Sequence, residues 1–242
     1  MMERLRDAWF EFKGVMCYER GAYMTGMPTR YAPGLRGEEK TISGRSGTVL
    51  VTDGSYDSVE VALSFIVPKL EYRQEALEWL TGTGLLRFSD EPDRAYEARI
   101  LKKYKRAPKF KHLTGEEYSV TFSCQPFRIP IPEPREMKFT ESGAAWYNPG
   151  SAPARPRVTI LGKGDFSLSI AGSQVIFSNV KNGIIVDSDL MDALTLDGKA
   201  LANDRISGAP WTIPPGRFRI EWTLNEGAEI DSVSILPRWR YL

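Results

Sequence analysis

Apolar and polar residues alternate along much of this chain, and a period of two residues is typical of strands that bury one face. In the first half the alternation is clearest over residues 59–65 and 118–124, where every second residue is apolar. Shorter strands are predicted at residues 8–12, 48–51, 85–88 and 96–101. We therefore expect the first half to be mainly β.

One segment has the period of a helix instead. Between Lys69 and Leu80, the side chains of Leu70, Arg73 and Leu77 fall on one side, while acidic residues face the other. The glycines of Thr81–Gly84 follow, and glycine commonly ends a helix. We predict one helix over residues 69–80.

Residues 20–47 have little apolar periodicity. They are rich in Gly, Pro, Arg and Glu, which predicts an exposed loop or an extended arm that cannot bury a core of its own.

The strand predicted at 118–124 leads into a series of prolines at positions 126, 130, 132 and 134. Proline lacks the backbone donor, so we expect neither a helix nor a central strand to continue through this segment. The chain is therefore predicted to form two domains, with boundaries at 1–132 and 133–242.

The second half is predicted to be all β. Strands are expected at 158–161, 166–170, 174–177, 183–187, 218–222 and 232–236. The segment Gly162–Asp165 is interpreted as a hairpin turn, and residues 188–210 as a polar connection. Six or more short strands without a helix predict a β-sandwich of jelly-roll type.

Composition and charge exclude several classes of protein. The chain is 42% hydrophobic and 26% charged, as in globular proteins with a core, and it has no apolar run of 18 residues. Residues 1–138 carry 22 Lys and Arg against 20 Asp and Glu, and residues 139–242 carry 10 against 11, so neither half is a basic nucleic-acid module. The N-terminus has no apolar signal segment, which predicts synthesis in a cytoplasm.

Residues that could carry chemistry are few. His112 is the only histidine in the sequence, which excludes mechanisms that need two, and Cys17 and Cys124 are interpreted as buried free thiols. Asp187–Asp192 resembles the start of a calcium loop, but Asp192 replaces its glycine and Gly198 its glutamate, so we expect a turn. No catalytic, cofactor or metal site is predicted.

Two clusters leave a binding role open. Lys102, Lys103, Lys105 and Arg106 form a basic segment that could touch nucleic acid or an acidic partner, or be the solvated face of a hairpin. Trp146 and Trp211 could stack on a sugar, or pack in the core or at an edge of the sandwich.

Several segments, in order, resemble the distal tail proteins (Dit) of long-tailed phages and related prophages. They are Ile42–Thr48, Asp53–Tyr56, Glu78–Leu80, Leu86–Pro92, Phe122–Phe127, Asn148–Gly150, Ile213–Gly216 and Pro237–Arg240. The resemblance covers nearly the whole chain.

This resemblance implies a structural protein of the tail tip, not an enzyme. It implies that residues 1–132 form a belt domain that closes into a homohexameric ring, and that residues 133–242 form a galectin-like sandwich. The implied partners are the major tail protein of the tube, a tail-associated or receptor-binding protein at the tip, and DNA in transit through the lumen. The implied location is the virion tail tip, with assembly in the host cytoplasm and no membrane partner.

Arm residues Arg30, Tyr31, Arg36, Glu38 and Arg45 are predicted interface residues, because an extended segment could reach a neighbouring subunit. The alternative hypothesis is a glycan-binding adhesion module that uses the C-terminal sandwich. A wall-degrading enzyme is a third hypothesis, because paired carboxylates need only be close in space.

Overall fold

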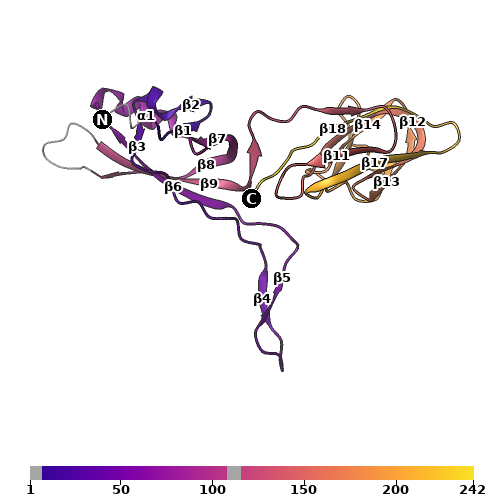
Figure 1. Ribbon diagram of the computed structural model, residues 1–242, viewed down its shortest axis with the longest axis horizontal. Coiled ribbons are helices and arrows are strands. Elements are labelled where there is room, and N and C mark those ends of the chain that lie inside the picture. Colours follow the sequence, from indigo (N-terminus) through magenta and orange to yellow (C-terminus); the bar gives the residue numbers. More distant parts are fainter. Residues whose placement is uncertain (1–6, 108–115) are drawn as a thin grey trace. The chain divides into compact units, whose positions relative to one another are not determined.

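The computed structural model describes residues 7–107 and 116–242 (Figure 1). The chain separates into two compact units, Met1–Ile131 together with Leu242, and Pro132–Tyr241. Strands dominate both units, and α1 is the one α-helix in the described part of the chain. The predicted mainly β fold class is confirmed.

The first unit is built on a seven-stranded sheet in the order β2-β1-β7-β8-β9-β6-β3, in which neighbouring strands are antiparallel. Its strands are β1 (Phe10–Phe12), β2 (Val15–Met16), β3 (Tyr23–Met24), β6 (Val59–Val67), β7 (Thr83–Phe88), β8 (Glu91–Ala107) and β9 (Glu116–Pro130). The short 3-10 helix η1 (Cys17–Arg20) joins β2 to β3.

The strand predicted from the alternation over residues 59–65 is confirmed as part of β6, and it buries one face. Val59, Val61, Leu63 and Phe65 are buried on one face of β6. The same face of the sheet carries a cluster of aromatic side chains from β1, β7 and β9. Burial of this apolar surface is the main source of the unit's stability.

The helix is shorter than predicted. The 3-10 helix η2 (Leu70–Tyr72) precedes α1 (Arg73–Trp79), and Arg73 contacts Glu116 of β9 at 3.4 Å instead of the apolar core. The indole nitrogen of Trp79 donates to the carbonyl of Phe12 at 2.9 Å. The helix also ends without a glycine cap, because Leu80 follows it with a φ of −78°, and Gly84 already lies in β7.

The expectation that no central strand continues through Pro126 is wrong. β9 runs to Pro130, because the ladder shifts register there: Tyr96 pairs with Arg128 and Ala98 with Cys124. Three residues of β9 therefore lie opposite one residue of β8, in a bulge that accommodates a residue without a backbone donor. β6 begins at Val59 opposite Cys124, so Pro126 has no ladder partner on that side either.

The second unit is a β-sandwich of two sheets that share one long strand, β12 (Arg157–Ile170). The first half of β12 pairs with β14 and β18, and its second half pairs with β13 and β17. The remaining strands extend the two sheets. They are β10 (Met137–Phe139), β11 (Ala144–Asn148), β13 (Ser173–Val180), β14 (Gly183–Asp187), β15 (Asp192–Thr195), β16 (Ile206–Ser207), β17 (Gly216–Leu224) and β18 (Glu229–Leu236).

The hairpin turn predicted at Gly162–Asp165 is wrong, because β12 passes through it from one sheet to the other. The register shifts at Leu161/Gly162 against β18 and at Gly164/Phe166 against β13. A Cβ on Gly162 would lie 2.3 Å from the carbonyl oxygen of Glu229. Glycine is therefore needed here for close approach of two backbones, not for a chain reversal.

The polar connection predicted at 188–210 contains more structure than expected. β15, the 3-10 helix η3 (Asn203–Arg205) and β16 lie within it, and Ala193 and Ala202 are buried. β10 and β11 were not predicted. No helix in the described ranges is long and apolar enough to cross a membrane.

Candidate functional site

The most unusual feature of the first unit is an exposed arm, residues 25–58, between β3 and β6. No residue of the arm is buried. At its far end β4 (Glu38–Thr41) and β5 (Thr48–Val51) pair with each other and not with the seven-stranded sheet (Figure 1). The predicted exposed arm is confirmed for residues 25–47, but Ala22 and Met24 belong to the core.

The arm carries apolar side chains that no part of it covers. The exposed fractions are 41% for Met27, 73% for Tyr31, 47% for Leu35, 49% for Ile42, 46% for Leu50 and 50% for Val51. Exposed apolar residues gathered on one element are typical of an interaction surface. An isolated two-stranded hairpin is also only marginally stable in water.

The two legs of the arm are held together near its base. The amide of Arg36 donates to the carbonyl of Ser55 at 2.8 Å, and the amide of Asp57 donates to that of Gly34 at 2.9 Å. The ring of Tyr56 packs edge-on against Phe127 of β9, with ring centroids 5.2 Å apart. These contacts keep the two legs of the arm side by side and pack the second leg against β9.

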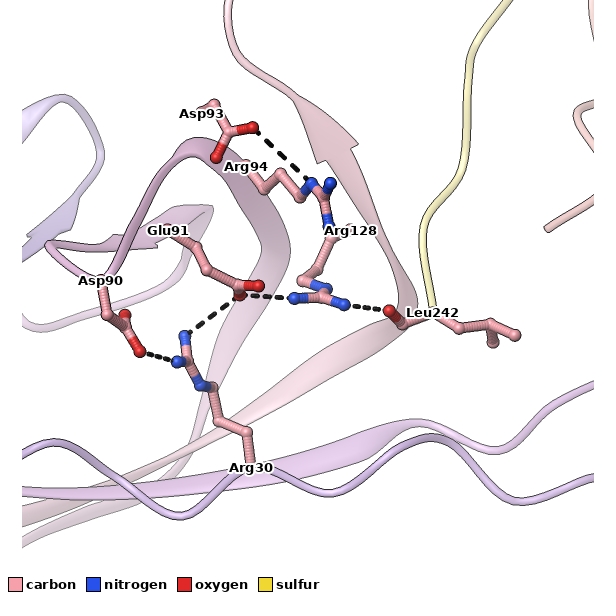
Figure 2. Close-up of polar contacts among 7 residues, drawn as sticks. All are labelled: Arg30, Asp90, Glu91, Asp93, Arg94, Arg128 and Leu242. Carbon is pink, nitrogen blue, oxygen red and sulfur yellow. Dashed lines mark hydrogen bonds and ion pairs between the residues drawn. The ribbon is translucent and has the colours of Figure 1, made fainter. Parts of the chain in front are cut away.

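A charged network at the turn between β7 and β8 anchors the first leg (Figure 2). The Arg30 guanidinium contacts Asp90 and lies 3.6 Å from the Glu91 carboxylate. Glu91 also pairs with Arg128 of β9, which donates to the backbone oxygen of Leu242. Each carboxylate is therefore matched by at least one cation.

Arg30 also covers part of the core. Its guanidinium carbon lies 5.0 Å from the ring centroid of buried Phe88, a cation–π arrangement. Burial raises the pKa of Tyr96 nearby, while the charges of Arg128 and Arg30 act in the opposite direction. Arg30 was predicted as an interface residue, yet its side chain is 18% exposed and engaged within its own unit.

The other predicted interface residues lie beyond this anchor. Tyr31 is 73% exposed, and Arg45 lies exposed in the loop between β4 and β5. Arg36 pairs with Asp57 at 2.9 Å and Glu38 with Lys40 at 3.3 Å, in both cases with mostly exposed side chains. Their role in an interface stays a prediction.

A pocket of about 470 Å³ lies in the first unit next to the bulge between β8 and β9. Its lining combines Glu97 and Arg99 of β8 with residues of β7 and β9 that are mostly uncharged and polar or small. Cys124 also lines it, but its side chain is only 1% exposed, and burial raises the thiol pKa to about 12. A thiol with such a pKa is not a nucleophile near neutral pH.

The predicted basic segment lies on β8. Lys102, Lys105 and Arg106 pair in register with Thr121, Ser119 and Tyr118, and Lys103 lies between them. The structure does not describe the side chains of the four basic residues, so a binding role stays a prediction. His112 lies outside the described residues.

The predicted sugar platform is wrong for Trp211, which is fully buried and stacks against Phe177 with ring centroids 6.2 Å apart. Trp146 is 46% exposed, lies opposite buried Phe218 on β17, and contacts Phe139 edge-on at 6.0 Å. Its position matches edge packing, and a role in glycan stacking stays a prediction for Trp146 alone.

The segment 187–192 forms the expected turn. The Asp187 carboxylate forms two hydrogen bonds with Arg238, at 2.6 and 2.8 Å, and accepts the amides of Asp189 and Leu190. Burial raises the pKa of Asp187, but these hydrogen bonds and the Arg238 charge outweigh burial and hold it below its usual value. Within residues 7–107 and 116–242, no group of three or more His, Cys, Asp and Glu side chains could hold a metal ion.

Fold and arm together define a mainly β chain of two units whose most prominent surface feature is an exposed two-stranded element. Neither a protein-family model nor a curated protein sequence matches the chain. Among solved structures it is similar to the Dit protein of phage SPP1, described as a paradigm of the hub adsorption apparatus in phages that infect Gram-positive bacteria. The TM-score is 0.73 at 15% identity, over 94% of this chain and 97% of that one. At this identity the similarity shows a common fold.

Proposed function

We propose that this chain is a structural protein of a phage or prophage tail tip: a distal tail hub without enzymatic activity. The observation that carries the proposal is the similarity of fold to a phage hub protein over nearly the full length of both chains. A hub needs surfaces that bind other chains and needs no catalytic centre, and the arm supplies such a surface.

The proposed assembly is a homohexameric ring between the tail tube and the adsorption apparatus. In this assembly the first unit is the ring-forming belt, the second a galectin-like sandwich, and DNA passes through the lumen. A closed ring needs heterologous contacts, in which two different patches of each copy meet. The arm, with its unpartnered apolar residues, is one such patch.

Charge is compatible with this role. Lys and Arg exceed Asp and Glu by two in residues 1–138, 22 against 20. Each phosphate that a protein neutralises adds affinity for DNA, so a nearly neutral lining favours free passage. The partners proposed at the two ring faces are the major tail protein and a tail-associated or receptor-binding protein, in the virion after assembly in the host cytoplasm.

Light scattering after size exclusion and negative-stain images test the proposal. We expect a mass near six times 27.3 kDa and six-fold rings with a central opening, either alone or after addition of the tail tube encoded by neighbouring genes. A chain that remains monomeric under both conditions, and is absent from purified tails, would contradict it.

A glycan-binding adhesion module is the second candidate function, because Trp146 and the adjacent Tyr147 are 46% and 57% exposed. Titration with host wall polysaccharide should quench tryptophan fluorescence in the native chain and not in Trp146→Ala. No response across a broad glycan panel would reject it.

A further inference from the structure

The pocket beside the bulge between β8 and β9 holds two opposite charges that do not pair with each other. Glu97 and Arg99 of β8 both line it, and both residues are exposed. Within residues 7–107 and 116–242, neither side chain forms an ion pair or a hydrogen bond. The two residues alternate along β8 with buried Tyr96 and Ala98, so they lie on the sheet face away from the aromatic core.

A buried hydroxyl group lies next to these charges. Ser123 of β9 pairs in register with Arg99, lines the pocket and is 8% exposed. Its hydroxyl has no hydrogen-bond partner among the residues that the structure describes. Folding has already removed this hydroxyl from most of its water, so a hydrogen bond to a ligand carries little further desolvation cost.

The pocket has the size of a small-molecule site. Its volume is about 470 Å³, and ligand sites in proteins have volumes of about 300–1,000 Å³. Gly84 of β7 and Ala98 of β8 line it with little or no side chain, which leaves this space open. Gln125 lies in the bulge, without a residue of β8 opposite it in register, and its side-chain amide offers the pocket both a donor and an acceptor.

We propose that this pocket binds a short peptide with both termini free, of the size and charge of a dipeptide. Arg99 binds the carboxylate of the ligand, Glu97 binds its ammonium group, and Ser123 and Gln125 bind the peptide group between them. The inference goes beyond the proposed hub function, and neither proposal depends on the other.

Charge selects a zwitterion over an ion of one sign. A carboxylate bound at Arg99 lies near the carboxylate of Glu97, and an ammonium group bound at Glu97 lies near the guanidinium of Arg99. Like charges about 7 Å apart repel each other even in water. A ligand with both charges replaces each of these repulsions with an attraction, and both of its charged groups form charge-assisted hydrogen bonds.

The spacing of the two charged residues selects a dipeptide over a single amino acid. Glu97 and Arg99 are two residues apart on an extended strand, which separates their Cα atoms by about 6.6–6.8 Å. An extended chain of two residues spans about 7 Å, and one residue spans half of that. A dipeptide that lies along β8 therefore brings its ammonium group to Glu97 and its carboxylate to Arg99.

Saturation-transfer NMR with three matched probes tests the charge requirement. The probes are glycylglycine, which carries both charges, N-acetylglycylglycine, which is an anion, and glycylglycine amide, which is a cation. We expect glycylglycine to bind the chain with a Kd on the order of 1 mM. Each singly charged probe should bind at least about fivefold more weakly, because it loses one charge-assisted hydrogen bond.

Variants test the role of each residue. Glu97→Gln and Arg99→Gln should each weaken the binding of glycylglycine about fivefold or more, whereas Arg217→Gln, a matched change of an exposed residue on β17, should leave it unchanged. Glu97→Arg combined with Arg99→Glu should bind glycylglycine better than either single variant, because the zwitterion can reverse its direction.

Ser123→Ala separates binding from stability. It should weaken the binding of glycylglycine about two- to tenfold and leave Tm unchanged, because the hydroxyl has no partner in the free chain. Thermal melts of every variant verify that it is folded.

The outcomes decide the proposal without reference to the ring. Preferential binding of glycylglycine that both single charge variants lose, and that the double variant regains, supports the site. The site is overturned by the absence of saturation transfer to glycylglycine, by equal binding of a singly charged probe, or by binding that either single charge variant leaves unchanged. Six-fold rings without dipeptide binding leave the hub proposal standing, and dipeptide binding by a chain that forms no ring supports the site and contradicts the hub.

Discussion

Replacing Arg30 by methionine should release the first leg of the arm from the β7–β8 turn. Methionine keeps an apolar stem against Phe88 but loses the contacts with Asp90 and Glu91. The side chains of Arg30, Asp90 and Glu91 are 18%, 36% and 33% exposed, so we assign the ion pairs about 0.5–1 kcal/mol after solvent screening. The cation–π contact adds about 0.5–1 kcal/mol.

The expected total of about 1–2 kcal/mol corresponds to a local opening constant that rises about 5- to 30-fold. Hydrogen exchange measured by mass spectrometry should show faster exchange in peptides that cover residues 24–36, where the amide of Thr25 is bonded to Ser64. Peptides from β9 should be unchanged, because Arg30→Met leaves the core intact.

Arg36→Met is the matched control. Arg36 also forms an ion pair on the arm, with Asp57 at 2.9 Å, but the two side chains are 63% and 61% exposed. Such a pair contributes about 0–1 kcal/mol, so we expect a change in exchange of a few-fold at most. Equal effects of the two variants, or faster exchange throughout the unit in Arg30→Met, would refute the assignment of Arg30 as the anchor.

Two further predictions concern buried groups. Asp187→Asn should lower the free energy of unfolding by about 2–3 kcal/mol in urea, because it breaks a pair with Arg238 whose carboxylate is 6% exposed. Asp189→Asn, with a carboxylate 45% exposed, should cost less than about 1 kcal/mol, and equal losses would contradict this reasoning. The pKa of Asp187 is held below its usual value in the folded chain. Its contribution to the free energy of unfolding is therefore present above the unfolded pKa and is lost as pH falls through the folded pKa. The difference in stability between Asp187→Asn and the native protein should then disappear in acid. Cys17 and Cys124 should resist a disulfide reagent at pH 8 until the chain is unfolded, because burial raises the pKa of both thiols, that of Cys124 to about 12; rapid reaction of the folded chain would show that the thiols are accessible.

Strands with one buried face were predictable from the local sequence, because alternate side chains of a strand point to opposite faces and only one of those faces meets the core. The alternation over 59–65 gave β6 in this way. The continuation of β9 through Pro126 and of β12 through Gly162 was not predictable. Both depend on what a distant strand does, namely β8 opposite Pro126 and β18 opposite Gly162.

In the candidate site too, features set by the local sequence were predictable and features set by distant contacts were not. Low periodicity and many Gly and Pro residues predicted an exposed segment, but not that β4 would pair with β5 within it. The burial of Trp211 follows from its packing against Phe177, 34 positions earlier in the chain. A sequence pattern does not contain that contact.

The position of Arg30 at the base of the arm bears on how the arm could bind a partner. It was predicted as part of an interface because it lies in an arm, yet the structure uses it to hold the base of the arm against its own unit. Association costs less when the binding segment is already held near its bound direction, since less conformational entropy is lost. In the proposed assembly, an anchor at Arg30 would present Tyr31 and the hairpin beyond it to a partner as an oriented surface. A free loop with the same exposed residues would have to be ordered at the moment of binding.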